Sequence, residues 1–438
     1  MIGKRWSGAC LAWAALVVVA CAGPSRAHKL ELNAKIAAKD WAGAEAQLEA
    51  GKDSQYGDNN SVLFWLDKAA VLHDAGRFQE SDALLDLAEQ KLDALYTQSI
   101  SRAAGTFFVN DNTDEYRGEP HERALLHVLR ALNYAYQDQN EGAVVEARKV
   151  SEFLTELGDK LGAKDVYRGD AFAEYLAALL FEDGGRADDA RISIASAREH
   201  YGWYTERYGT PEPILDPGVG TPGDGELVLL HYNGVAPRRV SQTIQVAWND
   251  AMAVVNASAQ DEDNAEAKNA LVAGVSADAV TVAFPAQIQD PFRVRASEIE
   301  VDGVKARTVL MEDIAAISTK ALEDRNAAIR ARAVARATLK FIAAKVAEET
   351  TKQQLGQGWG MLAGMVARAA SAATEVADTR CWGTLPAEIR MARLRLPAGH
   401  HLVNVSYLDE NGAVVGVETL EVDTKPGKRT WAHVRSAI

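Results

Sequence analysis

The sequence predicts a multidomain protein of the α plus α+β class, with helical repeats in its N-terminal half and a β-rich C-terminal half that contains a long helical hairpin. Three observations lead to this prediction. Residues 29–208 are rich in Ala, Leu, Glu and Lys, and their apolar residues recur with a helical period. Residues 209–225 are rich in Pro and Gly. Beyond them, short apolar runs alternate with polar residues, as in strands.

Residues 1–20 have the pattern of a signal peptide. Lys4 and Arg5 give a positively charged start, and an apolar run from Ala9 to Ala20 follows. A transmembrane helix needs about 20 apolar residues, so this run is too short to span a membrane. We therefore expect the protein to be exported.

Cys21 is the expected lipidation site. The Val-Val-Ala that precedes it resembles the lipobox of bacterial lipoproteins, in which the cysteine is acylated and becomes the mature N-terminus. Residues 21–28 would then form a lipid-anchored tether. Because Ala22 rather than Asp follows, we expect the periplasmic face of the outer membrane. Cleavage after Ala27 and simple secretion to the periplasm are the alternative.

Composition excludes one class of partner. The chain has 438 residues, a formal net charge of −14 and no compact basic patch, so nucleic acid is not expected to bind. Cys10 lies in the signal segment, and Cys381 is the one cysteine after Cys21. A single thiol cannot form an internal disulfide, and a buried apolar cysteine is the expected outcome.

The helical domain at 29–208 contains three segments with the spacing of a tetratricopeptide helix pair. Small residues allow close helix packing and large apolar ones fill the space between pairs. The spacing between the first and second segments far exceeds the roughly 34 residues of that repeat, so a generic helical bundle is the alternative. The matching residues are Trp65, Ala69, Leu72, Gly76, Phe78, Ser81, Leu85 and Ala88; Ala131, Tyr134, Asn140, Ala143, Ala147 and Val150; Ala178, Phe181, Gly185, Ala190, Ile194 and Ala197.

An insertion at 99–119 separates the first two helix pairs and is the best candidate for a functional surface. Tyr116, Glu119, Glu122 and Arg123 are the residues expected to contact a partner. The alternative is that these residues form a structural ion-pair network joining the first and second helix pairs. Just before the linker, an aromatic cluster is expected to close the last helix pair or to face a ligand; it comprises Tyr201, Trp203, Tyr204 and Tyr208.

The C-terminal domain at 226–438 is expected to combine strands with two long helices. Asp302-Gly303 and Asn411-Gly412 are typical hairpin turns. Residues 378–438 are predicted to form an antiparallel, β-sandwich-like module that could share a sheet with the earlier strands. The predicted strands are Leu227–Tyr232, Val280–Phe284, Phe292–Val301 and those from Ile389 onward.

The helical hairpin is predicted from Met311–Glu349 and Gln353–Ala377. Arg325, Arg332 and Arg336 border the apolar face of the first helix and form a candidate basic stripe. Such a stripe could bind an acidic partner or a phosphate. The alternative is that these arginines pair with nearby carboxylates of the chain itself.

The chemical motifs of the common enzyme classes are missing from the sequence. It contains no H-E-x-x-H, G-x-S-x-G, S-x-x-K or Walker sequence. His400 and His401 are adjacent, so on a strand they would point to opposite faces and could not share a metal. We therefore predict no catalytic residue, no metal and no cofactor.

Several segments together resemble a family of tetratricopeptide-like lipoproteins of Gram-negative bacteria. The resemblance covers most of the mature chain. It implies an envelope lipoprotein and brings no established activity, although relatives tend to be encoded near small envelope lipoproteins that resemble activators of cell-wall synthases. The segments are Glu115–Glu119 with Glu122-Arg123, Ala131–Tyr134, Val145–Arg148, Asn233–Arg238, Ala321–Arg325, Arg332–Arg336, Asp378–Trp382 and Leu385-Pro386.

These observations favour a non-enzymatic, lipid-anchored scaffold that binds envelope protein partners through its helical array. Two alternatives stay open. The protein could be an activator of a cell-wall synthase, which would bind that enzyme without turnover of its own. It could also be a glycan-acting envelope enzyme, which would need two carboxyl groups about 5–9.5 Å apart in a cleft between the halves.

Overall fold

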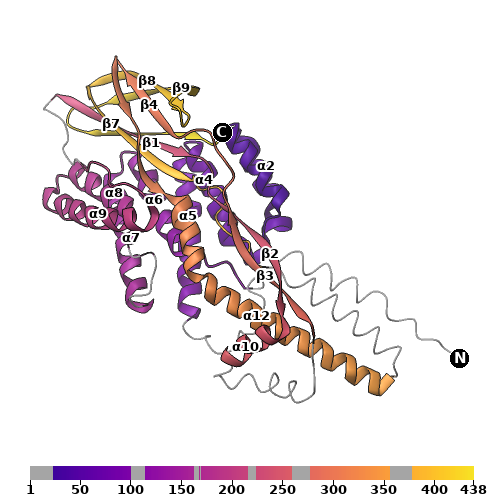
Figure 1. Cartoon of the computed structure of the whole chain (residues 1–438). Coiled ribbons are helices and arrows are strands. Elements are labelled where there is room, and N and C mark those ends of the chain that lie inside the picture. The colour runs from indigo at the N-terminus through magenta and orange to yellow at the C-terminus, as the bar shows by residue number, and fades with distance from the viewer. Residues whose placement is uncertain are drawn as a thin grey trace.

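The computed structural model describes residues 23–99, 114–161, 167, 169–215, 223–258, 277–355 and 377–438. The predicted signal peptide and Cys21 lie outside this range, as do residues 100–113 of the predicted insertion. Figure 1 shows helices on one side of a pair of stacked sheets, with a long helix extending from this body. The predicted combination of a helical N-terminal half and a mixed C-terminal half is confirmed.

The N-terminal half is a succession of helices in which sequential neighbours pack together. Two short helical segments, η1 (Lys52–Tyr56) and η2 (Asp58–Asn60), lie between helices α3 and α4, whose bounds follow. The α-helices are α2 (Arg26–Ala37), α3 (Trp41–Gly51), α4 (Ser61–Asp74), α5 (Phe78–Ser99), α6 (Pro120–Ala135), α7 (Asn140–Leu161), α8 (Ala171–Asp183) and α9 (Ala187–Tyr208).

The same backbone turn closes the first helix of each successive pair. Its central residue has a positive φ: 56° at Lys39, 75° at Gly76, 58° at Asp138 and 70° at Gly185. The N–H of the following residue donates to the carbonyl five positions earlier, as Arg77 N does to Leu72 O at 2.9 Å. This is a Schellman turn, which reverses the chain after a helix. The three predicted helix pairs are therefore present as helix pairs.

The strands that the structure describes form two four-stranded sheets and a two-stranded ribbon. The inner sheet has the order β10 (Arg429–Ser436), β1 (Asp224–Asn233), β7 (Glu388–Pro397), β6 (Val309–Asp313). The outer sheet has the order β5 (Val304–Arg307), β4 (Ala296–Val301), β8 (Gly399–Leu408), β9 (Val414–Thr424). The ribbon pairs β2 (Arg238–Ala247) with β3 (Ala279–Ile288).

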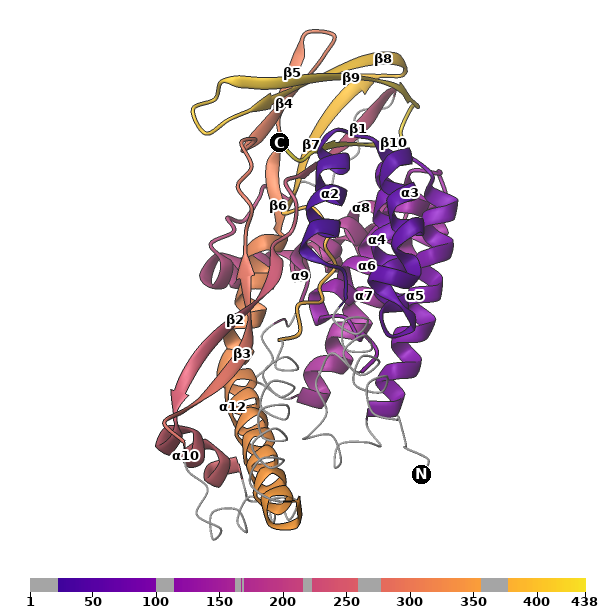
Figure 2. The same ribbon diagram turned by 90° about the vertical axis from the view of Figure 1, so that its right-hand side faces the viewer.

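The inner sheet is buried on both faces. Leu227 and Leu229 of β1 pack in a core shared with the outer sheet. The alternate residues Val228, Leu230 and Tyr232 belong to the core of the helical half. Side chains alternate between the faces of a strand, so β1 contacts both layers and reads as a continuous apolar run. Helices, inner sheet and outer sheet thus form three layers (Figure 2).

The predicted sandwich-like segment 378–438 contributes strands to both sheets and shares each of them with earlier strands; the sequence had left such sharing open for one sheet. Its strands β7 and β10 lie in the inner sheet, whereas β8 and β9 lie in the outer sheet. The other strands of both sheets come from earlier in the chain: β1 and β6 in the inner sheet, and β4 and β5 in the outer sheet. In addition, β10 pairs with β1 in parallel, so the segment is not an antiparallel meander. The hairpin turns at Asp302-Gly303 and Asn411-Gly412 are confirmed.

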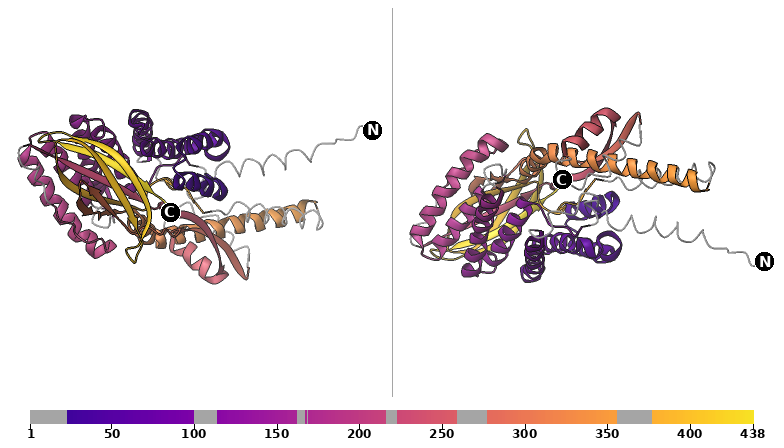
Figure 3. Two further views of the ribbon diagram at one scale, coloured as in Figure 1. Left: turned by 90° about the horizontal axis from the view of Figure 1, so that it is seen from above. Right: turned by 90° about the horizontal axis from the view of Figure 1, so that it is seen from below.

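An arm of the structure extends away from the layered body (Figures 2 and 3). Its main element is α12 (Ile314–Leu355), 42 residues long, which spans about 60 Å. The ribbon and α10 (Trp248–Ser258) pack on one side of α12 around Val282 and Val334. The helix begins three residues later than predicted because Met311 belongs to β6. The second helix of the predicted hairpin lies mostly outside the described range.

The predicted linker at 209–225 does not separate two independent cores. Trp382, Leu385 and Met311 of the C-terminal half belong to the same buried cluster as the helical residues. The last residues of the predicted linker are part of β1, which begins at Asp224. The two halves therefore fold against each other as one body.

Candidate functional site

The start of α6 places two glutamates where the halves meet. Glu119 is the N-cap residue, Pro120 occupies the first turn, and the Glu122 side chain accepts a hydrogen bond from the Glu119 N–H at 2.7 Å. This capping box and the proline are strong local signals for a helix start. These local interactions hold the side chains of Glu119 and Glu122 at the N-terminus of α6.

The carboxylate of Glu119 lies between two arginines from the C-terminal half. Arg239 of β2 donates to Oε1 at 2.7 Å, and Arg325 of α12 donates to Oε2. Glu119 and Arg239 are buried, whereas the Arg325 side chain is 45% exposed. Burial by itself would raise the pKa of Glu119, but the two positive charges outweigh it and hold the pKa well below its usual range.

Glu122 is hydrogen-bonded on both oxygens. Oε2 accepts from the Tyr116 hydroxyl as well as from the Glu119 N–H, and Oε1 accepts from the Trp382 N–H at 2.7 Å. Burial and the nearby charge of Glu119 raise the pKa of Glu122. This residue therefore links α6 to the segment that precedes β7.

Arg380 completes the junction. Its guanidinium donates to the Asp114 carbonyl at 2.7 Å, and to Asp378 at 2.9 and 2.7 Å, and lies over the Tyr116 ring. Its own carbonyl accepts from Arg239 at 3.3 Å. An open cavity of about 250 Å³ adjoins these groups and is lined by charges of both signs. We call the set Tyr116, Glu119, Glu122, Arg239, Arg325 and Arg380 the junction cluster.

The structure brings some of the predicted site residues together and separates others. Tyr116, Glu119, Glu122 and Arg325 meet in the junction cluster, but Arg123 does not. Arg123 donates to Asp93 of α5 at 2.7 Å and lies over the ring of Phe153 of α7. It therefore connects helices of the first and second pairs, as the structural alternative expected.

The predicted basic stripe is not a single surface. Arg325 pairs with Glu119, as the alternative reading of the stripe expected. Arg332 is exposed and makes no ion pair within the part of the chain that the structure describes. Arg336 is buried. The three arginines thus lie in different environments on one helix, and their role in binding a partner stays a prediction.

Sequence reasoning missed Arg239, Arg380 and Trp382 as members of this site. Arg380 and Trp382 lie in a segment that carried the family resemblance, which was a usable signal. No sequence signal pointed to Arg239, because β2 was not predicted as a strand.

The predicted aromatic cluster lies against the inner sheet. Tyr201 donates to the Met311 carbonyl at 3.0 Å, and Tyr204 donates to Glu312 at 3.1 Å.

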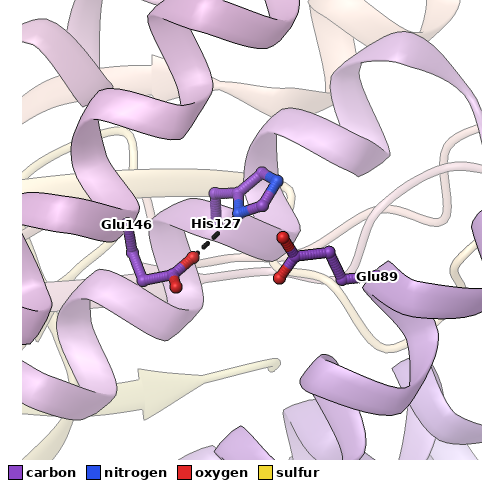
Figure 4. Close-up of side chains that lie close together, drawn as sticks. All are labelled: Glu89, His127 and Glu146. Atoms are coloured by element: carbon purple, nitrogen blue, oxygen red, sulfur yellow. Dashed lines mark hydrogen bonds and ion pairs between the residues drawn. The ribbon is translucent and has the colours of Figure 1, made fainter. Parts of the chain in front are cut away.

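A second group of polar side chains has the residue types of a metal site. Glu89 of α5, His127 of α6 and Glu146 of α7 place one potential ligand atom each within 4.8 Å of one another (Figure 4). However, Lys149 Nζ lies 2.9 Å from Glu89 Oε1 and 3.0 Å from Glu146 Oε1, and Arg130 also pairs with Glu89. These cations already neutralise the carboxylates, so the group acts as an ion-pair network between the first two helix pairs.

Four carboxylates at the contact between the halves accept from protein donors on both oxygens, whereas Oε2 of the buried Glu312 has no hydrogen-bond partner among the residues that the structure describes. Besides Glu119 and Glu122, Asp67 accepts from Tyr56 and Thr384, and Glu226 accepts from arginines of β7 and β10. A glycosidase needs one carboxyl group to protonate the leaving group and another to act on the sugar or on water. These four groups are arranged as structural acceptors and not as such a pair.

Comparison with protein-family models, with curated proteins and with solved structures finds no match. Among the helices that the structure describes, none is both long and apolar enough to cross a membrane.

Proposed function

We propose that this chain is a lipid-anchored, non-enzymatic adaptor of the cell envelope. In this proposal Cys21 carries the lipid, the body lies at the periplasmic face of the outer membrane, and the tetratricopeptide-like helical half contributes to binding a protein partner. The committed carboxylates at the junction favour this function over a glycan-acting enzyme. Activation of a cell-wall synthase is a narrower form of the same proposal.

The main supporting observation is the short connection between Cys21 and the folded body. Gly23 lies against Arg380, so closely that an added Cβ would be 2.8 Å from the arginine Cγ. Ser25 caps α2, and Lys29 donates to the Thr379 carbonyl at 3.0 Å. The segment expected to be a tether at 21–28 is therefore packed from Gly23 and helical from Arg26.

This packing has a consequence for an acylated chain. With the lipid on Cys21, Ala22 alone would separate it from the first packed residue. The membrane would then hold the body close to its surface with a restricted orientation, and the Asp378–Arg380 segment would lie near the attachment point. Such restriction suits an adaptor that presents one surface to a partner in the same membrane.

The helical half does not offer all of its surface to a partner. Tyr232, Met311 and Trp382 from the C-terminal half are buried in its core, so the face toward the inner sheet is already occupied. A partner of the helices would therefore contact the surface away from the sheets. This differs from the binding mode in which a repeat array encloses a peptide on its inner face.

The proposal is tested by metabolic labelling with a clickable palmitate analogue. The full chain is expected to incorporate the label and to sediment with outer membranes, and Cys21→Ala is expected to lose the label and become periplasmic. Equal labelling of both forms would contradict the lipid anchor.

A second variant tests the restricted orientation. About 20 Gly and Ser residues inserted between Ala22 and Gly23 would add a mean reach of about 25 Å while leaving acylation intact. We expect this insertion to reduce crosslinking to the membrane-bound partner. Unchanged crosslinking would show that the short connection has no role.

A further inference from the structure

Three side chains of α9 hold the base of the arm. Tyr201 donates to a main-chain carbonyl of β6 at 3.0 Å, and Tyr204 donates to the carboxyl group of Glu312 in the same strand at 3.1 Å. Arg207 forms an ion pair with Asp324 of α12. Residues three apart lie on one face of a helix, so this face of α9 contacts β6 and the first turns of α12, the main element of the arm (Figure 2).

Glu312 is the buried carboxyl group of this contact. Its exposed fraction is 0%. Oε1 accepts from Tyr204, whereas Oε2 has no hydrogen-bond partner, and Glu312 forms no ion pair, among the residues that the structure describes. A carboxylate removed from water needs several donors or a cation to offset its lost hydration. A single hydrogen bond of 3.1 Å suits a neutral, protonated carboxyl group and not an anion.

The titratable groups around Glu312 also disfavour a negative charge. Asp170 and Asp313 are themselves carboxyl groups, and the others are tyrosines. Burial, and then the nearby charge of Asp170, raise the pKa of Glu312, in agreement with the geometry. The groups are Asp170 and Tyr167 at the start of α8, Tyr201, Tyr204 and Tyr208 of α9, and Asp313 of β6.

Asp170, the other buried carboxyl group of this set, has the donors that Glu312 lacks. It caps α8: Oδ1 accepts from the Ala173 N–H at 2.8 Å, and Oδ2 accepts from the Tyr167 hydroxyl at 2.8 Å. Burial raises the pKa of Asp170 as well, but these donors oppose that rise. A helix N-terminus also favours a negative charge. Of the two carboxyl groups, Glu312 is therefore the better place for a proton.

We propose that Glu312 is a proton-controlled latch between α9 and the base of the arm. While Glu312 keeps its proton, the contact through Tyr204 stays closed. When a rise in pH transfers this proton to water, a second negative charge forms near Asp170 and has to be hydrated, so β6 and the start of α12 separate from α9. The arm then changes its position relative to the helical half. This regulatory property goes beyond the adaptor function and does not depend on the lipid anchor.

The test compares the full mature chain, kept in solution by Cys21→Ala, with the same chain carrying Glu312→Gln, which has no proton to lose. Infrared difference spectroscopy at neutral pH detects the carbonyl stretch of a protonated carboxyl group. Hydrogen exchange between about pH 5 and pH 9, read by mass spectrometry, follows residues 200–208 and 309–320. Comparing both chains at the same pH removes the intrinsic effect of pH on exchange. Glu206→Gln, at an exposed position of α9, is the matched control, and thermal melting confirms that each variant is folded.

We expect a protonated-carboxyl band that is present in the parent and in Glu206→Gln and is missing from Glu312→Gln. The ratio of exchange rates between the parent and Glu312→Gln should rise by up to about tenfold per pH unit, because opening releases one proton. Asp170→Asn, which keeps a helix cap, should reduce this rise, since loss of the nearby charge lowers the pKa of Glu312. The same band in the parent and in Glu312→Gln, or equal exchange of these two chains at every pH, would overturn the inference.

Discussion

Glu119 and Arg239 are 120 positions apart in the sequence, and their side chains form a buried ion pair with a distance of 2.7 Å. Glu119 caps α6 in the helical half, and Arg239 belongs to the ribbon that extends from the sheets. The pair therefore connects the two halves at the junction cluster. Arg325 of α12 also pairs with Glu119, so the first part of the long helix takes part in the same contact.

We expect Glu119→Gln to lower the free energy of unfolding by about 3–5 kcal/mol, because it leaves the buried Arg239 without its anionic partner. Arg325→Gln should cost less than about 1 kcal/mol, since that side chain is 45% exposed and water can solvate its charge. Urea unfolding of both variants measures the difference. Equal losses would show that the buried pair does not join the halves.

The pH dependence of stability should change in Glu312→Gln. Burial, and then the nearby charge of Asp170, raise the pKa of Glu312 well above its ordinary value of 4.5. A raised pKa in the folded state stabilises the fold fully below the unfolded value, and this contribution is lost as the pH rises through the folded pKa. Groups around it include Asp313, Tyr204 and Tyr201.

Glutamine stays neutral at every pH, so Glu312→Gln should lose less stability than the parent chain between about pH 5 and pH 8. The melting temperature across this interval is the measurement. Glu119 titrates with the opposite sign: its lowered pKa stabilises the fold above the unfolded pKa, and this stabilisation is lost as the pH falls. Parallel melting profiles for Glu312→Gln and the parent would contradict the prediction.

Two glycine-to-alanine changes should have opposite effects. Gly76 has a φ of 75° in the turn between α4 and α5, so Gly76→Ala should destabilise the chain by about 1–2 kcal/mol. Gly202 lies in the interior of α9 with no neighbouring atom within 4 Å of an added Cβ. Gly202→Ala should therefore stabilise it by about 0.5–1 kcal/mol. Denaturant titration of both variants checks the signs, and a stabilising Gly76→Ala would refute the assigned turn.

Zinc should not bind at Glu89, His127 and Glu146 in the parent chain, because Lys149 and Arg130 already compensate the carboxylates. Isothermal titration calorimetry of the mature chain with zinc chloride is expected to give no stoichiometric heat from this group. Binding that disappears in His127→Ala would show that the cations give way to a metal.

The helical half could be predicted because its signals are local. Gly76 and Gly185 mark turns that the helix spacing had already indicated, and the capping box at Glu119 and Glu122 fixes the start of α6. Two of the four positive-φ turn residues, Lys39 and Asp138, carry no such signal because residues other than glycine rarely adopt this conformation. Local sequence signals therefore predict the helix pairs but do not predict every turn between their helices.

Only some residues of the junction cluster could be predicted, because the others reach it through the packing of distant elements. Nothing near Glu119 indicates that Arg239 or Arg325 would reach it from distant strands and helices. The exposed residues of β2 are mostly polar, so its alternation was too weak to indicate a strand. Likewise, the spacing of Arg332 and Arg336 predicts neighbouring positions on one helix but not that one is exposed and the other buried.

The most direct test of the central claim is capture of a partner from crosslinked envelopes with the full chain and with Cys21→Ala, read by mass spectrometry. The lipid-anchored adaptor predicts that one envelope protein is recovered with the acylated chain and is lost with Cys21→Ala, although both forms are folded and equally abundant. Failure to enrich any envelope protein with the acylated chain, or equal recovery with both forms, would contradict it.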